Sequence, residues 1–162
     1  MQPDTAITSS NQQVLQVPLR WLAHGVGLDT PGYGSEHAAG MDLHAALPAD
    51  EPVTIEPGRI ALIPCGFAMA VPIGFEAQVR PRSGLATKFG ISMPNAPGTI
   101  DADYRGEVRV PLINHGGKPF VVERAMRIAQ MLILPVPRVA WQVVEDLDNT
   151  ARGGGGFGHT GV

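Results

Sequence analysis

The sequence lacks a second cysteine, a long uninterrupted apolar run and a basic cluster, and each absence excludes a class of protein. Cys65 is the only cysteine among 162 residues, which rules out an internal disulfide framework. The longest charge-free apolar stretch, residues 60–75, contains proline and glycine and is too short to span a bilayer. A net charge of −3 without a basic run argues against a nucleic-acid-binding surface. Residues 1–13 do not resemble a signal peptide, so we expect a cytoplasmic protein that binds neither membrane nor nucleic acid.

Glycine and proline are abundant instead, with 20 and 15 residues, which favours turns over long helices. Apolar and polar residues alternate over short segments, and this period of two is typical of half-buried strands. Pro57-Gly58 and Pro64 are interpreted as turns between such strands. The sequence therefore predicts an all-β barrel or sandwich, with strands near 15–21, 53–55, 60–62, 67–71, 75–79, 108–112, 120–122, 128–134 and 139–143.

The length fits one domain with two extensions. We predict a disordered N-terminal tail over residues 1–13, a β domain over 14–148 and a flexible glycine-rich C-terminal arm over 149–162. One short helix is predicted, with Ser83 as its N-cap and Gly90 as its stop.

The start of that helix is the first candidate for chemistry. Arg82, Ser83 and Gly84 lie where a strand ends and a helix begins, and free backbone N–H groups at a helix start bind phosphate well. The arginine adds a fork of donors, and the glycine allows an anion to approach closely. The same residues also fit an ordinary capped helix with a surface arginine.

The second candidate is the stretch 95–107, interpreted as a strand, a turn at 101–106 and a returning strand. Asp101 and Asp103 lie beside Tyr104 on this hairpin. A carboxylate fixed there could take a proton from water as a general base. The alternative is that both aspartates serve only the turn, as aspartate often does.

The third candidate is the glycine-rich tail, in which Arg152 and Phe157 stand among glycines. Its spacing approaches that of a phosphate-binding P-loop, but His159 stands where lysine is required, so that motif is rejected. A lid that becomes ordered on a ligand fits better, with the ring stacking on a base and the arginine meeting a phosphate. A tail without function is the alternative.

A fourth candidate is Asp42 within residues 39–43, which could support a metal ion through water or could simply serve a turn. The five histidines show no convincing ligand spacing and are interpreted as surface or loop residues. Magnesium needs no dedicated protein cage when a substrate triphosphate supplies the oxygens.

Taken in order, these segments resemble the trimeric dUTPase family, whose five motifs are matched here by residues 39–43, 81–86, 98–106, 127–131 and 152–161. One such match would be weak evidence, whereas five in sequence make chance improbable. The resemblance implies a distorted jelly-roll of the β-clip type, a homotrimer with shared active sites, and hydrolysis of dUTP to dUMP and pyrophosphate with Mg²⁺. This reaction limits uracil in DNA and supplies dUMP for thymidylate synthesis.

The resemblance also implies a role for each site residue. Asp101 would deprotonate the water that attacks the α-phosphorus, and Tyr104 would leave no room for a 2′-hydroxyl. Asp42 would contact the waters around Mg²⁺. The hairpin around Asn95 and Gly98 would read the uracil edge. The phosphates would be held by Arg82, Ser83, Gly84 and Gln130, and the arm would close through Arg152, Phe157, Gly158, His159 and Thr160.

Two positions depart from the family pattern. Ala125 and Met126 stand where glycine and an acidic residue are usual, which leaves a rearranged turn open. His159 stands where serine is usual, so phosphate affinity could depend on pH. The alternatives are a dCTP deaminase, which shares the fold, and a nucleotide-binding regulator that has lost catalysis. The complete fifth motif and the Ile-Asp-Ala-Asp-Tyr sequence of residues 100–104 favour the dUTPase.

Overall fold

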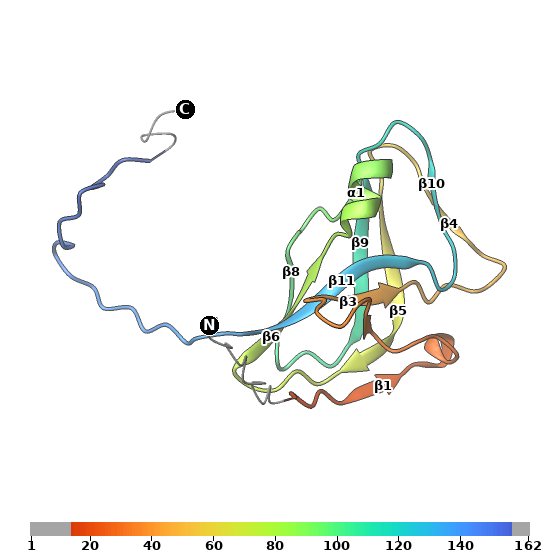
Figure 1. Cartoon of the computed structure of the whole chain (residues 1–162), viewed down its shortest axis with the longest axis horizontal. Helices are drawn as coiled ribbons and strands as arrows, with labels where there is room; N and C mark the ends of the chain where they lie inside the picture. Colours follow the sequence, from red (N-terminus) through yellow and green to blue (C-terminus); the bar gives the residue numbers. More distant parts are fainter. Residues whose placement is uncertain (1–13, 157–162) are drawn as a thin grey trace, which may run out of the picture.

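The computed structural model describes residues 14–156, in which short antiparallel strands form a β body and the chain then runs away from it (Figure 1). The elements in chain order are β1 Leu19–Trp21, the 3-10 turn η1 Ala23–Gly25, β2 Gly32–Tyr33, β3 Met41–His44, β4 Val53–Ile55, β5 Ile60–Met69, β6 Phe75–Arg80, α1 Ser83–Phe89, β7 Ile91–Ser92, β8 Gly98–Ile100, β9 Glu107–Asn114, β10 Phe120–Val122 and β11 Arg127–Pro135. The predicted all-β class with one short helix is confirmed.

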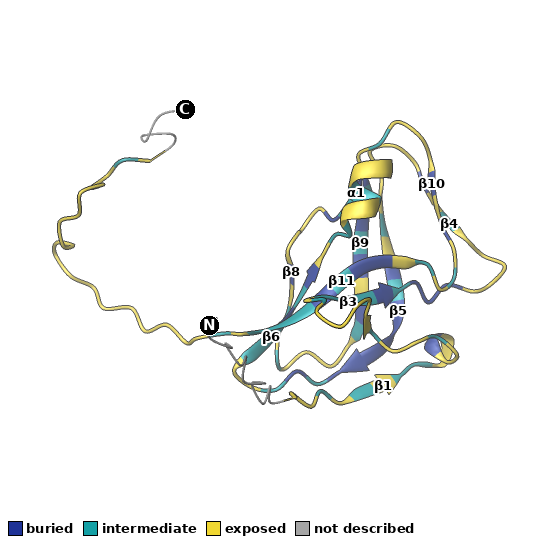
Figure 2. Ribbon diagram, in the orientation of Figure 1, coloured by how far each residue is buried: buried dark blue, intermediate teal, exposed yellow. Residues whose placement is uncertain are grey.

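Two larger sheets enclose the core. One has the order β2-β3-β11-β6-β8 and the other β1-β5-β9-β7, while β10 and β4 form a separate pair. Alternate residues of both sheets point inward, as the buried Val108, Val110 and Leu112 of β9 illustrate (Figure 2). Cys65 is buried in this core, and burial raises the pKa of its thiol to about 12, so the thiol stays protonated.

Asn114 is a polar residue that is fully buried at the end of β9. Its side-chain nitrogen donates to the carbonyls of Ile55 and Lys118, both at 2.8 Å, and its oxygen accepts from the N–H of Gly116 at 2.8 Å. One side chain thus joins β4, β9 and the following turn, and all of its polar atoms are paired.

The helix ends where the sequence predicts and begins one residue away from the prediction. Gly90 has φ 72°, a left-handed conformation that glycine adopts without strain, and it closes the helix. The N-cap is Arg82 rather than Ser83, because Pro81 and Arg82 continue the extended path of β6 and Ser83 is the first helical residue.

The prediction of a turn at Pro64 is wrong, because β5 runs through it without a break. The register against β9 shifts between Pro64 and Ala68, and Gly66 within this interval has φ 73°. Proline inside a sheet is tolerated at such bulges, where the ladder does not need its missing N–H.

The strands on either side of residues 101–106 exist, but they do not form the predicted hairpin. β8 pairs with β6 in one sheet, whereas β9 pairs with β5 and β7 in the other. The loop therefore crosses between sheets. Alternation in the sequence reports which face of a strand is buried and carries no information about its partner.

The predicted strand over residues 139–143 is absent, because no sheet edge of this chain lies beside it. Beyond β11 the chain leaves the body, and the alternating Val139, Trp141 and Val143 are 70%, 91% and 96% exposed (Figures 1 and 2). The first strand is shorter than predicted and covers Leu19–Trp21. No helix in residues 14–156 is long and apolar enough to cross a membrane.

Candidate active site

The loop after β8 and the start of β9 line an open cleft of about 500 Å³. Asp101 and Tyr104 both line it, and both are exposed. The Tyr104 N–H donates to the Asp101 carbonyl at 3.1 Å, so a tight turn holds the two residues in a fixed relation. An exposed carboxylate on an ordered turn can hold a water molecule and accept its proton.

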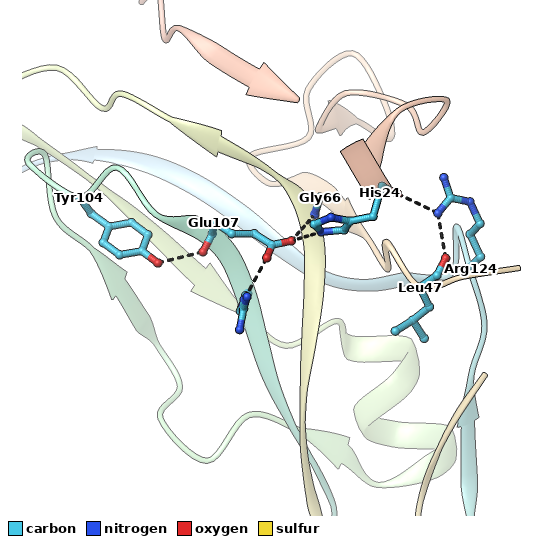
Figure 3. Close-up of polar contacts among 7 residues, drawn as sticks. His24, Leu47, Gly66, Tyr104, Glu107 and Arg124 are labelled. Atoms are coloured by element: carbon cyan, nitrogen blue, oxygen red, sulfur yellow. Dashed lines mark hydrogen bonds and ion pairs between the residues drawn. The ribbon is translucent and has the colours of Figure 1, made fainter. Parts of the chain in front are cut away.

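The Tyr104 side chain is held at its hydroxyl end (Figure 3). Its hydroxyl donates to the Glu107 carbonyl at 2.9 Å. The ring covers Gly106 so closely that a Cβ at this position would overlap the ring and its hydroxyl oxygen. The glycine is therefore required for the tyrosine to lie where it does.

Asn95 and Gly98 lie on the other approach to β8. Asn95 is exposed in the turn between β7 and β8, and Gly98 is buried at the start of β8. A Cβ on Gly98 would lie 3.2 Å from the side-chain nitrogen of Asn95, so the two residues are neighbours. Backbone groups and an amide side chain in this position can pair with the edge of a base.

A second group of polar residues gathers where β3, β11 and the start of α1 meet. The Asp42 carboxylate pairs with Arg82 at 3.0 Å and with Arg127 at 3.1 Å. Gln130 lies opposite Asp42 in the ladder and donates its side-chain N–H to the Pro81 carbonyl at 3.0 Å. The predicted residues of the first, second and fourth motifs are thus brought together.

Ser83 and Gly84 complete this second group. They form the exposed first turn of α1, where the first helical hydrogen bonds are those of Leu85 and Ala86 to Arg82. The N–H groups at the beginning of a helix have no partner within it and favour anions. Nothing within 4 Å would meet a side chain at Gly84, so the approach to these groups is open.

The two groups lie at opposite ends of β6. Ile100 pairs with Ala77 near the beginning of β6, so Asp101 continues past that end. Arg82 follows Arg80 at the other end, five to six residues away along the strand. With a rise of about 3.3 Å per residue, this corresponds to roughly 15–20 Å.

Of the predicted arm residues, the described Arg152 is not brought to either group. Arg152 is exposed and donates to the Gly155 carbonyl at 2.7 Å within its own segment, far from the body (Figure 1). The predicted Phe157, Gly158, His159 and Thr160 lie outside the described residues.

Sequence reasoning missed three participants. Arg127 opens the fourth motif, but the sequence analysis assigned it no role, and the structure pairs it with Asp42. Glu107 directly follows the predicted loop, and its side chain is only 7% exposed. His24, interpreted as a surface or loop residue, contacts Glu107 across 83 positions of sequence, a distance over which no local pattern carries a signal.

Glu107 remains ionised in this environment. Burial by itself raises the pKa of its carboxyl group. The hydrogen bonds from His24, the Gly66 N–H and Arg109 together outweigh burial, and the pKa lies below the ordinary 4.5.

The departure at Ala125 keeps the conformation of the turn. Ala125 has φ 64°, the left-handed region that favours glycine. Its N–H donates to the Ala45 carbonyl, and the Ala45 N–H donates to the Met126 carbonyl, both at 2.9 Å. The turn is thus fixed to the start of the segment after β3, and Gln130 keeps its place.

Comparison with known proteins places this geometry in a family. The dUTPase family model matches residues 28–161. A deoxyuridine 5'-triphosphate nucleotidohydrolase of Maricaulis maris is 61% identical over 146 residues, covering 90% of this chain and 96% of the relative. One from Sinorhizobium medicae is 60% identical over 141 residues, covering 87% of this chain and 88% of the relative.

Solved structures agree at the level of the fold. A dUTPase of Staphylococcus bacteriophage 80alpha superposes with a TM-score of 0.81 at 23% identity, covering 92% of this chain and all of that chain. The family model and the two relatives each span most of the sequence, and the matched residues 28–161 of the family model include all the residues that form the two polar groups. The chain belongs to the dUTPase family.

Proposed function

We propose that the chain hydrolyses dUTP to dUMP and pyrophosphate, with the Asp101 carboxylate as the general base. The observation that carries the assignment is the exposed carboxylate, held on a tight turn beside Tyr104 in an open cleft. The bacterial relatives named deoxyuridine 5'-triphosphate nucleotidohydrolase support the choice of substrate.

In the proposed reaction, Asp101 accepts a proton from a water molecule whose oxygen bonds to the α-phosphorus. The bond from that phosphorus to the bridging oxygen breaks in line, and pyrophosphate leaves with the negative charge. Arg82, the first-turn N–H groups of Ser83 and Gly84, and Gln130 stabilise this charge. Positioning and charge neutralisation supply most of the catalysis at phosphorus, so this donor set suits the reaction.

Base selection is assigned to the approach to β8, and sugar selection to Tyr104 in the cleft. Uracil presents acceptor, donor and acceptor along its pairing edge, which a backbone segment near Gly98 and the Asn95 amide can match. Cytosine would leave buried groups unpaired, and such mismatches are strongly rejected. The Tyr104 ring, held over Gly106, stands against the sugar and excludes a 2′-hydroxyl.

Mg²⁺ is the proposed metal. Within residues 14–156 no three His, Cys, Asp or Glu side chains cluster as a metal cage. The donor chemistry therefore suits an ion carried mainly by the triphosphate oxygens, with Asp42 reaching its water shell. The bound ion neutralises phosphate charge. A dUTPase of phage phi11 coordinates a structural Mg(II) ion, which is a property of that protein.

A homotrimer with shared active sites is part of the proposal. The backbones of Asp101 and Arg82 of one chain are roughly 15–20 Å apart along the strand direction, a separation that favours two chains over one as the source of the base and of the phosphate donors. A site combining Asp101 of one subunit with the phosphate-binding group of another resolves the separation.

Two exposed apolar features support assembly. Ile60 and Leu62 of β5 are 57% and 56% exposed, although they belong to a central sheet. The segment after β11 exposes Trp141 and its alternating neighbours, which form a strand pattern without a sheet. A neighbouring subunit supplies the missing partner surface for both features. The arm from Arg152 through Thr160 then closes over a substrate in the trimer.

A panel of nucleotides tests the reaction. We expect pyrophosphate release from dUTP and from neither dCTP nor dTTP, with a requirement for Mg²⁺. Ammonia release from dCTP would indicate a deaminase, and tight nucleotide binding without turnover would indicate a regulator.

The role of Asp101 is tested by Asp101→Asn, with Asp103→Asn as the matched control. The amide cannot accept the proton, so we expect dUTP binding to persist while kcat falls by about 10²–10⁴-fold. The control retains most activity, because Asp103 is an exposed neighbour outside the cleft lining. A near-wild-type rate from Asp101→Asn would remove this residue as the base.

A further inference from the structure

We propose that Glu107 is a positioning residue for dUTP hydrolysis, whose buried carboxylate anchors the loop that carries Asp101 and Tyr104. This inference rests on the proposed function. The loop 101–106 crosses between the two sheets, and no ladder hydrogen bonds join the strands on either side of it. The turn hydrogen bonds fix the shape of the loop, and contacts at its ends fix its position relative to the sheets.

The carboxylate of Glu107 receives three hydrogen bonds (Figure 3). The Gly66 N–H donates at 3.0 Å, the His24 Nε2 at 2.5 Å and the Arg109 Nε at 3.0 Å. Two of these donors belong to other elements, β5 and η1. The first residue of β9 is thus tied by its side chain to the neighbouring strand β5 and to the N-terminal segment. Hydrogen bonds to an ionised acceptor are about twice as strong as neutral ones.

The bulge in β5 makes the Gly66 N–H available. Between Pro64 and Ala68 the ladder with β9 is interrupted, and Gly66 turns its backbone with φ 73°. A Cβ at Gly66 would overlap the backbone of Gly25, so η1 packs directly against the bulge. Glu107 therefore satisfies a backbone donor that the bulge would otherwise leave unpaired.

The anchor reaches the substrate-facing residues in two steps. The backbone carbonyl of Glu107 accepts the Tyr104 hydroxyl at 2.9 Å, and the Tyr104 N–H in turn holds the Asp101 carbonyl at 3.1 Å. A displacement of Glu107 moves the acceptor that holds the tyrosine ring. Because the ring is proposed to exclude a 2′-hydroxyl, sugar selection is the property most sensitive to this anchor.

The test compares Glu107→Gln with Glu56→Gln, an exposed glutamate in a turn far along the chain. The amide oxygen can still accept from Gly66 and His24, but the NH2 group then faces the donating Arg109 guanidinium and the negative charge is lost, so the anchor is weakened while the volume is kept. We expect kcat/KM for dUTP to fall by roughly tenfold to a hundredfold, and the preference for dUTP over UTP to fall about tenfold or more. Glu56→Gln leaves both values unchanged.

His24→Ala is a second variant that removes one of the donors and leaves the buried carboxylate in place. We expect a smaller loss of the preference for dUTP over UTP. If Glu107→Gln does not fold, this variant alone tests the proposal. A merely structural contact would lower the unfolding midpoint without altering the dUTP to UTP ratio. An unchanged ratio in the folded variants overturns the role of Glu107, whereas a wild-type protein without dUTP turnover overturns the proposed function itself.

Discussion

At the scale of single residues, Ala125 adopts a left-handed backbone conformation that suits glycine better than alanine. The turn before β11 needs a left-handed residue, and alanine adopts φ 64° because two backbone hydrogen bonds to Ala45 fix it. An L-residue in this region carries a steric penalty of about 1–2 kcal/mol. Glycine lacks the penalty but loses more chain entropy on folding.

We therefore predict that Ala125→Gly stabilises the protein by roughly 0.5–1 kcal/mol. Urea denaturation of the variant and the wild type measures the difference. Ala129→Gly in β11 is the control: it removes a buried methyl group at an extended position and should destabilise instead. Loss of stability in Ala125→Gly would contradict the strain assigned to the turn.

At the scale of elements, Asn114 holds three pieces of chain together. Replacing it by alanine leaves the carbonyls of Ile55 and Lys118 and the N–H of Gly116 without their partner. Unpaired buried groups each cost about 1–3 kcal/mol, although water entering the gap recovers part of this.

We predict that Asn114→Ala lowers the free energy of unfolding by about 2–4 kcal/mol. Asn149→Ala, at an exposed position beyond the β body, is the matched control and should be neutral. Thermal unfolding followed by circular dichroism distinguishes the two. Equal midpoints for both variants would show that the three hydrogen bonds contribute little.

The sequence predicted the elements whose causes are local. Gly90 stops α1 because a left-handed residue is needed there, and the alternation in β6, β9 and β11 reports which faces are buried. It did not predict that β8 and β9 belong to different sheets, because strand pairing depends on residues that are distant in the sequence. The strand predicted over residues 139–143 is absent, because alternation alone does not supply a partner strand, and Val139, Trp141 and Val143 are exposed.

The candidate site follows the same division. Asp101, Tyr104, Arg82 and Gln130 were found because short segments resemble family motifs. The contacts of Glu107 with Gly66 and His24 join positions 41 and 83 residues apart. No local sequence pattern relates residues at such separations. The bulge in β5 brings them together, because it turns the Gly66 N–H toward Glu107 and packs against η1.

At the scale of the whole molecule, the dominant feature is the placement of Asp101 and Arg82 beyond opposite ends of β6. In the proposed ring of three subunits, each site would draw its base from one chain and its phosphate donors from another. The interface is directional, since the two contributions come from different surfaces of the same chain.

This arrangement predicts complementation between subunits. Asp101→Asn and Arg82→Ala homotrimers should each be nearly inactive, but unfolding and refolding them together in equal amounts restores intact sites at one interface of every mixed ring. Random assembly predicts about a quarter of the wild-type rate. Sedimentation of the refolded mixture verifies the number of subunits. As a control, Asp101→Asn is refolded with the double variant that carries both Asp101→Asn and Arg82→Ala. This mixture contains no intact interface, because neither chain supplies Asp101. Two defective proteins would thus make one working enzyme, without either chain being repaired.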